Sequence, residues 1–335
     1  MKILIVKPSS LGDVVHGLCV LKPLQDKFPD SQIHWVIAKG LEDIINDNTI
    51  VQHTWVIDKD KWKQLSKLKN TIHEIKSLST ALKTERFDVV IDLQGLLRSG
   101  IISKITGAPV RIGFANAREA STLFYTHKVK TKNDIHAVDR YLQLVQALGC
   151  NTENVSFPLP AIPPTPLTQH FTKGQYIVMV PGARWQSKRW PAWNFGRLAA
   201  MFNDKTIFVG SAAEQDIANE AMTYAHGNAV DLVGKTTLKE LIKLIEGAKF
   251  MVTNDTGPMH IGAALGVPVF AIFGPTAAFK TGPYGQHSWV LTTNAKCSPC
   301  FLKTCHDLHC LRNLSFTHVY EIISSKGQYI HKINN

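Results

Sequence analysis

Residues 253–260 have the sequence TNDTGPMH, and the small and apolar residues IGAALG follow at 261–266. The preceding FMV at 250–252 favours a short buried strand, and Asp255 or Thr256 can cap a helix that starts directly after it. Such a helix start points free backbone N–H groups and the positive end of its dipole at a nearby anion. The segment therefore predicts a phosphate site, with an ordinary strand-to-helix turn as the alternative.

Short apolar runs and helix-length segments alternate along the whole chain. The predicted strands lie at 3–6, 33–38, 89–93, 176–180, 206–209, 250–252 and 267–273, and the predicted helices at 14–28, 66–84, 137–149, 194–203 and 237–247. Strands that are apolar throughout and alternate with helices are typical of parallel sheets covered on both faces. The pattern predicts an α/β fold of two Rossmann-like, doubly wound domains that face a central cleft, with ligands at the carboxyl ends of strands.

Five prolines within residues 158–166 separate the two halves. Such a segment cannot continue a helix or donate to a central sheet, so it predicts a semi-rigid linker. The expected domains are 1–157 and 171–314, joined by the linker 158–170; the acceptor role of the first and the nucleotide-sugar donor role of the second are implied only by the family resemblance given below. The final helix and tail, 315–335, could pack on either half, including back on the N-terminal domain.

The 335 residues carry a formal net charge of +11. The excess is spread evenly, since residues 1–170 hold 21 Lys and Arg against 16 Asp and Glu, and the remainder holds 16 against 10. A diffuse excess favours anionic ligands in general, including nucleotide sugars and an acidic membrane face, over a reader of DNA grooves. No apolar stretch reaches the roughly 18 residues of a membrane span, and the N-terminus has no signal-peptide pattern. We therefore expect a cytoplasmic protein.

The densest basic run is the lysine series at 59, 61, 63, 67 and 69. Apolar residues recur among these lysines at helical spacing, which indicates an amphipathic helix with a basic face. A solvated helix face is the simpler interpretation. The sharper one is a site for a phosphorylated or membrane-borne acceptor, which would involve Lys61 and Lys63.

The first strand ends in a turn, KPSSLGD at 7–13, that leads into a helix. Gly12 permits close approach of the backbone, and Asp13 projects from the start of the helix. Ser10 or Asp13 could simply cap that helix, because both residue types are favoured caps. Alternatively, the Asp13 carboxylate could act as general base on a hydroxyl nucleophile.

In the second half, PGARWQSKRWP at 181–191 follows a strand and places cations beside small residues. Arg184 could bind a pyrophosphate through two N–H groups of its guanidinium, and Lys188 could bind it as a mobile point charge. The alternative is that this segment is an ordinary surface loop. After the next strand, Glu214 suits hydrogen bonding to ribose hydroxyls, although taken alone it is more typical of an ordinary first-turn acid of a helix.

Five segments together resemble the ADP-heptose:lipopolysaccharide heptosyltransferases, glycosyltransferase family 9. They are VKPSSLGDVVH at 6–16, DLQGLLRS at 92–99, HAVDR at 136–140, NDTGPMH at 254–260 and FGPT at 273–276. They occur in the family's order over nearly the whole chain, and the first two are most similar to heptosyltransferase I. The resemblance implies a GT-B fold and an inverting, metal-independent glycosyl transfer that needs no cofactor. It implies ADP-heptose as donor and, as acceptor, a lipopolysaccharide precursor of the Kdo-lipid A type, reached from the cytoplasm or from the inner-membrane surface.

The resemblance also implies roles for individual residues. Asp13 becomes the catalytic base, Glu214 a ribose contact and Asp255 a residue near the transferred sugar. The diphosphate contacts become Lys188, Thr256, Gly257 and His260. Apart from the resemblance, Arg184 is a further candidate for donor binding, and the candidate acceptor-binding residues are Ser10, Gly12, Lys61, Lys63 and Arg118.

The sequence departs from heptosyltransferase I at Cys297, Cys300, Cys305 and Cys310, four thiols within fourteen residues. Disulfides are disfavoured in a cytoplasmic chain, and a tetrahedral zinc or iron site is the physical alternative. The C-x2-C-x4-C-x4-C spacing is tighter than that of usual zinc knuckles. A structural metal site and a reduced or partly oxidised loop both remain open, while a catalytic role is not expected.

Three functions therefore compete. The first is a heptosyltransferase of the lipopolysaccharide inner core, and the second keeps the fold but changes the sugar or the acceptor. The third is a metal-stabilised, non-catalytic nucleic-acid-binding protein, motivated by the net charge of +11 and the four clustered cysteines. The ordered motifs favour the first, without a nucleic-acid partner.

Overall fold

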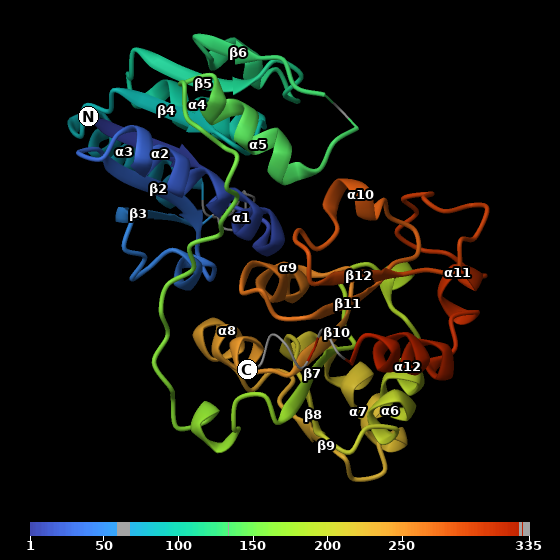
Figure 1. Ribbon diagram of the computed structural model, residues 1–335. Helices are drawn as coiled ribbons and strands as arrows, with labels where there is room; N and C mark the ends of the chain where they lie inside the picture. The colour runs from blue at the N-terminus through green and yellow to red at the C-terminus, as the bar shows by residue number, and fades with distance from the viewer. Residues whose placement is uncertain (59–67, 133, 328–329, 331–335) are drawn as a thin grey trace. The chain divides into compact units, whose positions relative to one another are not determined.

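Each half of the chain builds one parallel sheet with helices between successive strands (Figure 1). The computed structural model describes residues 1–58, 68–132, 134–327 and 330, with residues 68–75 described by their backbone alone. It divides into two compact units, Met1–Ala161 and Ile162–Asn335. The division falls within the proline-rich segment.

The N-terminal unit contains a six-stranded sheet in the order β3-β2-β1-β4-β5-β6, with every pair of neighbours parallel. Its central strand β1 is buried along nearly its whole length, which explains its apolar sequence KILIV. The strands are β1 (Lys2–Val6), β2 (Gln32–Ala38), β3 (Val51–Ile57), β4 (Val89–Asp92), β5 (Val110–Phe114) and β6 (His127–Val129).

The helices of this unit connect the parallel strands. They are α1 (Leu11–Gly17), α2 (Leu21–Lys27), α3 (Leu68–Thr84), α4 (Leu97–Ile105) and α5 (Ala137–Gln146), with 3-10 turns η1 (Leu18–Val20), η2 (Glu42–Ile44) and η5 (Ser121–Phe124). The single helix predicted at 14–28 is wrong in detail, because α1 and α2 are separate helices joined by η1. Gly17 ends α1 where a Cβ would meet the Trp35 ring at 3.2 Å.

The C-terminal unit repeats this organisation in the order β12-β11-β10-β7-β8-β9, again entirely parallel. Its strands are β7 (Tyr176–Val180), β8 (Lys205–Phe208), β9 (Ala229–Asp231), β10 (Phe250–Asn254), β11 (Val269–Ile272) and β12 (Ser288–Leu291). Its helices are α6 (Ala192–Ala200), α7 (Gln215–Tyr224), α8 (Leu238–Glu246), α9 (Gly257–Ala264), α10 (Ala278–Thr281), α11 (His309–Arg312) and α12 (Phe316–Ser325), with 3-10 turns η6 (Thr168–His170), η7 (Gln186–Lys188) and η8 (Ala212–Glu214).

Both sheets have the same strand order when each unit is numbered from its own first strand. The order is 3-2-1-4-5-6, which is that of the Rossmann fold. In this fold ligands bind at the carboxyl ends of the strands where the order reverses, between the first and fourth strands. The reversal points here are β1 and β4 in one unit and β7 and β10 in the other. The predicted fold of two Rossmann-like units is thereby confirmed.

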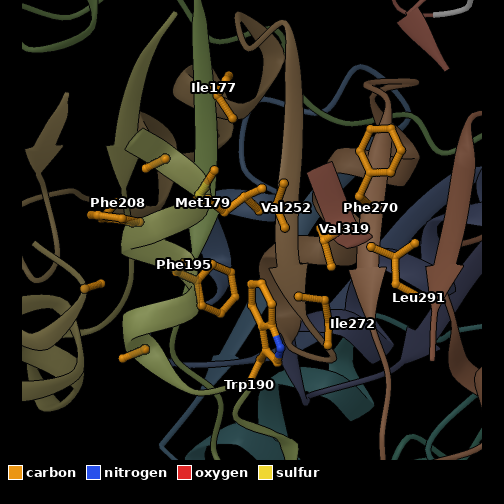
Figure 2. Close-up of a cluster of buried hydrophobic side chains, with 14 of the residues drawn as sticks. Ile177, Met179, Trp190, Phe195, Phe208, Val252, Phe270, Ile272, Leu291 and Val319 are labelled. Atoms are coloured by element: carbon orange, nitrogen blue, oxygen red, sulfur yellow. The ribbon is translucent and has the colours of Figure 1, made fainter. Parts of the chain in front are cut away.

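A buried cluster of large side chains holds the C-terminal unit together (Figure 2). Trp190 lies edge-on to Phe195 of α6, with ring centroids 5.0 Å apart, and its Nε1 donates to the Leu314 carbonyl oxygen at 2.8 Å. Asn254, at the end of β10, accepts from the Trp190 backbone N–H at 3.0 Å and donates to the Pro181 oxygen at 2.7 Å. The loop after β7 is therefore fixed to the end of β10, at the reversal point of the sheet.

The final helix α12 packs on the core of the C-terminal unit, one of the two halves that the sequence left open. Val319 and Ile323 are buried in the same cluster as Trp190, and α12 contacts α6. Its apolar face is covered by that core. Among the described residues, no helix is both long enough and apolar enough to cross a membrane.

Candidate active site

The turn after β1 places Asp13 at the start of α1. Its Oδ2 accepts from the Ser10 backbone N–H at 3.0 Å and from the Ser10 hydroxyl at 2.6 Å, while its side chain remains 41% exposed. The capping role that the sequence left open is therefore present. These two bonds fix the orientation of a carboxylate that solvent or a substrate can still reach.

Lys7 is a buried cation beside this carboxylate. Its Nζ lies 4.0 Å from Asp13 Oδ1, donates to the Leu93 carbonyl oxygen at 3.4 Å and stands 5.1 Å from the centre of the Tyr141 ring. Burial alone would lower the pKa of the Lys7 amine, but Tyr141, Asp13 and Asp92 raise it and the net shift is upward. Lys7 therefore remains charged and fixes a positive potential under Asp13.

Asp92 organises the neighbouring loop at the end of β4. Its Oδ1 accepts from the backbone N–H groups of Gln94 at 2.8 Å and Gly95 at 3.0 Å, and its Oδ2 accepts from the Tyr125 hydroxyl at 2.6 Å. Burial raises the pKa of Asp92, and these hydrogen bonds oppose that shift. The buried Asp92 carboxylate therefore holds the DLQG segment in place.

The structure describes three of the five predicted acceptor-binding residues. The Ser10 hydroxyl is engaged with Asp13, and Gly12 is buried in the first turn of α1. The Arg118 backbone N–H donates to the Gly95 oxygen at 3.0 Å, and the residue is exposed next to the DLQG loop. Lys61 and Lys63 lie outside the described residues. Ser10, Gly12 and Arg118 thus belong to the carboxyl end of the N-terminal sheet, and their contact with an acceptor stays a prediction.

In the C-terminal unit, three loops meet at Asp255. Its Oδ2 lies 2.6 Å from Lys188 Nζ, in the loop after β7, and accepts from the Thr276 hydroxyl at 2.6 Å, in the loop after β11. Asp255 is 7% exposed and the Lys188 side chain 18%. Because the pair is largely removed from water, the ammonium is held in one place and not free as at a surface.

Lys188 also stacks on an aromatic ring. Its Nζ is 4.7 Å from the centre of the Trp185 ring, whereas the neighbouring Arg184 is exposed. Arg189 Nε donates to the Ala183 oxygen at 2.7 Å, which closes the loop upon itself. Lys188 is therefore the fixed cation of this loop, and Arg184 the exposed one.

Thr256 occupies the N-cap of α9, directly after β10, and its side chain makes no capping bond among the described contacts. Gly257 and Pro258 follow on the first turn, and His260 is buried. The first backbone N–H groups of a helix have no partner within it. This helix start, next to Lys188, is the arrangement that favours an anion.

Glu214 combines a capping role with a defined position. Its Oε2 accepts from the Ser211 backbone N–H and hydroxyl, each at 2.8 Å. A Cβ on Gly182 would fall 2.2 Å from the Glu214 carboxyl carbon, and one on Gly210 3.0 Å from Oε2. The two glycines thus leave space for this carboxylate between the loops after β7 and β8.

Three of the four cysteines lie in the loop between β12 and α11, and Cys310 lies in α11 itself. Cys297 Sγ is 3.5 Å from His309 Nε2, and the Leu308 backbone N–H points at Cys305 Sγ at 3.5 Å. Burial raises the pKa of the Cys310 thiol, and the other three thiols raise it further. Nevertheless, the described chain contains no group of three or more Cys, His, Asp or Glu side chains placed to hold a metal ion. The predicted structural metal site therefore stays a prediction.

Sequence reasoning missed Thr276, Lys7 and Asn254 as parts of these sites. Each is a polar residue within or next to a quoted motif, at the end of an apolar strand or within four residues after it. Their position after a predicted strand could have identified them as candidates for the site, because the carboxyl ends of parallel strands lie at one edge of a sheet. The partner of each residue lies far away in sequence, so the pairing itself had no signal.

Two Rossmann-like units, one with an oriented carboxylate and one with a cation beside a helix start, are the organisation of GT-B glycosyltransferases, and the comparisons with known proteins place the chain in that class. The chain belongs to glycosyltransferase family 9, the heptosyltransferases, whose family profile, described as Glycosyltransferase family 9 (heptosyltransferase), matches residues 75–310. The family, the fold class and the enzyme class predicted from the sequence are thereby confirmed.

Individual members of the family are similar to this chain along most of their length. Lipopolysaccharide heptosyltransferase 1 of Pseudomonas aeruginosa is 32% identical over 321 residues, which cover 91% of this chain and 87% of that protein. The structure of E. coli heptosyltransferase WaaC with ADP is 26% identical with a TM-score of 0.81, covering 97% of this chain and 99% of that one. The structure of the same enzyme with ADP-2-deoxy-2-fluoro heptose has a TM-score of 0.79 at 26% identity, covering 97% and 100%.

Proposed function

We propose that this enzyme transfers a heptose from ADP-heptose to a lipopolysaccharide-core precursor of the Kdo-lipid A type. The observation that carries the proposal is the meeting of Lys188, Asp255 and Thr276 beside the start of α9, at the reversal point of the C-terminal sheet. A cation held next to a helix start suits a diphosphate. The relatives named as lipopolysaccharide heptosyltransferases, one of them solved with an ADP-heptose analogue, support ADP-heptose as the donor and a lipopolysaccharide precursor as the acceptor.

In the proposed reaction, Asp13 accepts the proton of an acceptor hydroxyl as that oxygen attacks the anomeric carbon on the face opposite ADP. The bond to the diphosphate oxygen breaks, and the product has the inverted anomeric configuration. Ser10 orients the base through its two hydrogen bonds to Asp13, and Lys7 keeps the carboxylate next to a fixed positive charge. General bases of this kind contribute about 10² to 10⁴ in rate.

The leaving diphosphate gains negative charge during this step. Lys188 and the first turn of α9, with Thr256, Gly257 and His260, are the groups proposed to stabilise it, so the reaction needs no metal or other cofactor. Arg184 is proposed as an additional exposed contact to the donor, and Asp255 as the residue nearest the transferred sugar. Glu214 would accept hydrogen bonds from the ribose hydroxyls.

A structural zinc or iron ion at the four cysteines is proposed independently of catalysis. Thiolates and imidazoles are suitable ligands, and Cys297 and His309 already lie close together. As described, however, the side chains would have to rearrange to form a coordination sphere. Metal analysis of protein purified under reducing conditions tests this, and less than one ion per chain would rule out an obligatory metal.

We further propose that the enzyme works in the cytoplasm, at the inner face of the membrane that carries its acceptor. The net charge of +11 supports attraction to an anionic lipid surface.

The decisive experiment combines the purified protein with a panel of nucleotide sugars and with truncated lipopolysaccharides. Product mass and ADP release are followed together. Heptose transfer to a Kdo-bearing acceptor is the expected result. Transfer of another sugar, or transfer only to another acceptor, would replace the proposal by the same-fold alternative.

A further inference from the structure

Residues 297–310, which follow β12 and end within α11, have no part in the proposed reaction, yet they are bonded to the donor half of the site. We call these residues the cysteine loop. Its first contact is with η7, the turn that ends in Lys188: the Ser187 hydroxyl donates to the Leu302 oxygen at 2.5 Å, and the Ser187 backbone N–H donates to the Lys303 oxygen at 3.3 Å. Ser187 is completely buried. The residue before Lys188 is thus fixed from outside its own loop.

A ring contact strengthens this attachment. The Trp185 ring has Lys188 Nζ at 4.7 Å and Lys303 Nζ of the cysteine loop at 5.7 Å from its centre. The tryptophan is therefore shared between the cation of the donor site and a cation of the loop, and movement of the loop would change the surroundings of both.

The second contact is with the segment after β11 that carries Thr276. The Phe301 backbone N–H donates to the Pro275 oxygen at 2.8 Å, and the Ser298 hydroxyl donates to the Gly274 oxygen. A Cβ on Gly274 would fall 3.1 Å from Cys310 Sγ, so the loop's last cysteine packs directly on this segment. Both ends of the cysteine loop therefore contact residues 274–275.

The two contacted segments converge on one carboxylate. Lys188, one residue beyond Ser187, and Thr276, one residue beyond Pro275, both contact Asp255 Oδ2 at 2.6 Å. The loop itself is drawn together, since Cys297 Sγ lies 3.5 Å from His309 Nε2. The cysteine loop therefore bridges the two segments that supply the partners of Asp255.

We propose that the cysteine loop positions the diphosphate site, and that Ser187 and Ser298 are the positioning residues through which it holds Lys188 and Thr276 at Asp255. This inference rests on the proposed function only in that Lys188 contacts the diphosphate of ADP. It assigns the loop to donor binding and not to the acceptor or to the proton transfer. Its effect should therefore appear in the affinity for ADP and in the KM for the nucleotide sugar.

The experiment measures ADP affinity by calorimetry for full-length Ser187→Ala and Ser298→Ala proteins. Loss of one of these hydrogen bonds should weaken ADP binding about fivefold to tenfold, with the KM of the acceptor within about twofold of wild type. Ser325→Ala is the matched control, because the Ser325 hydroxyl also donates to a backbone oxygen, that of Ile322 at 2.7 Å, but on α12. It should bind ADP as the wild type does.

A double-mutant cycle separates positioning from a general loss of structure. If Ser187 acts through Lys188, Ser187→Ala should have little further effect on ADP binding in a Lys188→Ala background. Measurements below the melting temperature of every variant keep the comparison among folded proteins. Additive losses, or an ADP affinity unchanged in Ser187→Ala and Ser298→Ala, would overturn the inference. A wild-type protein that binds no ADP would instead overturn the proposed function, and this inference with it.

Discussion

The Asp13 carboxylate serves two purposes that the sequence presented as alternatives. It accepts the Ser10 hydrogen bonds at the start of α1, and it is the proposed base. The two are compatible because both capping bonds go to Oδ2 while the side chain stays 41% exposed. Capping thereby becomes a means of orienting the base.

Replacement of Asp13 by asparagine separates the two purposes. An amide oxygen can still accept from Ser10, but it cannot take a proton. We expect Asp13→Asn to lower turnover by about 10² to 10⁴ and to leave ADP affinity nearly unchanged. Steady-state kinetics and calorimetry measure both.

The control for this prediction is Ser10→Ala, which removes the hydroxyl donor and leaves the carboxylate. It should cost about 1 kcal/mol of stability through the weaker cap, with a loss of turnover below about tenfold. Near-normal turnover in Asp13→Asn would show that another group is the base.

His34, on β2, predicts a pH dependence of stability. Burial lowers its pKa from the usual 6.5, His53 and Lys2 lower it further, and Glu85 opposes them. Trp55 Nε1 donates to His34 Nδ1 at 3.2 Å, which requires that this nitrogen carries no proton. At pH values between the folded and the unfolded pKa of this histidine, the unfolded chain binds more protons than the folded one. The contribution of neutral His34 to the free energy of unfolding is therefore fully present above about pH 6.5 and is lost as the pH falls below that value.

Urea unfolding at about pH 7.5 and pH 5.5 tests this sign, with His34→Gln as the non-titrating variant. Its amide oxygen can still accept from Trp55. The wild type should lose more unfolding free energy than the variant on acidification, by at most about 1.4 kcal/mol per pH unit. Equal losses would assign the acid sensitivity to other groups.

At the scale of elements, α6 and α7 pack closely at Gly196. A Cβ on Gly196 would fall 2.1 Å from the Ala221 backbone oxygen and 2.8 Å from Tyr224 Cβ. Helix propensity alone predicts that Gly→Ala stabilises a helix by about 1 kcal/mol. The backbone contact should reverse the sign, so we expect Gly196→Ala to destabilise the protein by about 1–3 kcal/mol.

Denaturant unfolding of Gly196→Ala beside Gly327→Ala checks this prediction. Among the described atoms, nothing lies within 4 Å of a Cβ on Gly327, so that substitution should be neutral or stabilising. If Gly196→Ala were stabilising as well, α6 and α7 would have room to separate without cost.

The elements that sequence could predict are those whose burial makes them apolar throughout. The central strands β1, β7 and β10 were predicted, but β3, β5, β6, β9 and β12 were not. Four of these five are the outer strands of their sheets, whereas β5 lies between β4 and β6 and begins with two partly buried residues. An outer strand pairs on one side only and is partly exposed, as the burial of β3 and β6 shows, so it carries no continuous apolar run.

Part of the candidate site could also be predicted from the sequence, and part could not. Asp13, Lys188 and the start of α9 follow strands that were predicted, and the order of these strands in the sheet brings Lys188 and α9 together. The Thr276 bond to Asp255 and the Ser187 bond to the cysteine loop join residues 21 and 115 positions apart. Such contacts depend on side-chain packing, which a single sequence does not encode as a local pattern.

At the scale of the whole molecule, the two units repeat one strand order but carry opposite chemistry at their reversal points. The N-terminal unit presents the Asp13 carboxylate, and the C-terminal unit presents the Lys188 ammonium beside a helix start. One fold thereby supplies both a site suited to a hydroxyl acceptor and a site suited to a diphosphate. In the proposed reaction, the acting groups therefore lie on the loops after the strands and not on the sheets.

The whole chain has a net charge of +11, divided almost equally between its halves. This charge predicts electrostatic binding to an anionic membrane surface. An anionic lipid surface attracts lysine and arginine by about 1 kcal/mol for each side chain near it, within roughly one Debye length. Vesicles rich in anionic phospholipid should therefore sediment more of the protein than neutral phosphatidylcholine vesicles do. Raising NaCl from about 50 mM to 500 mM should release most of the bound protein, because the Debye length shortens by about threefold. Salt-resistant binding to both kinds of vesicle would indicate insertion of apolar side chains, whereas no binding to either would place recognition of the acceptor entirely within the protein's own sites.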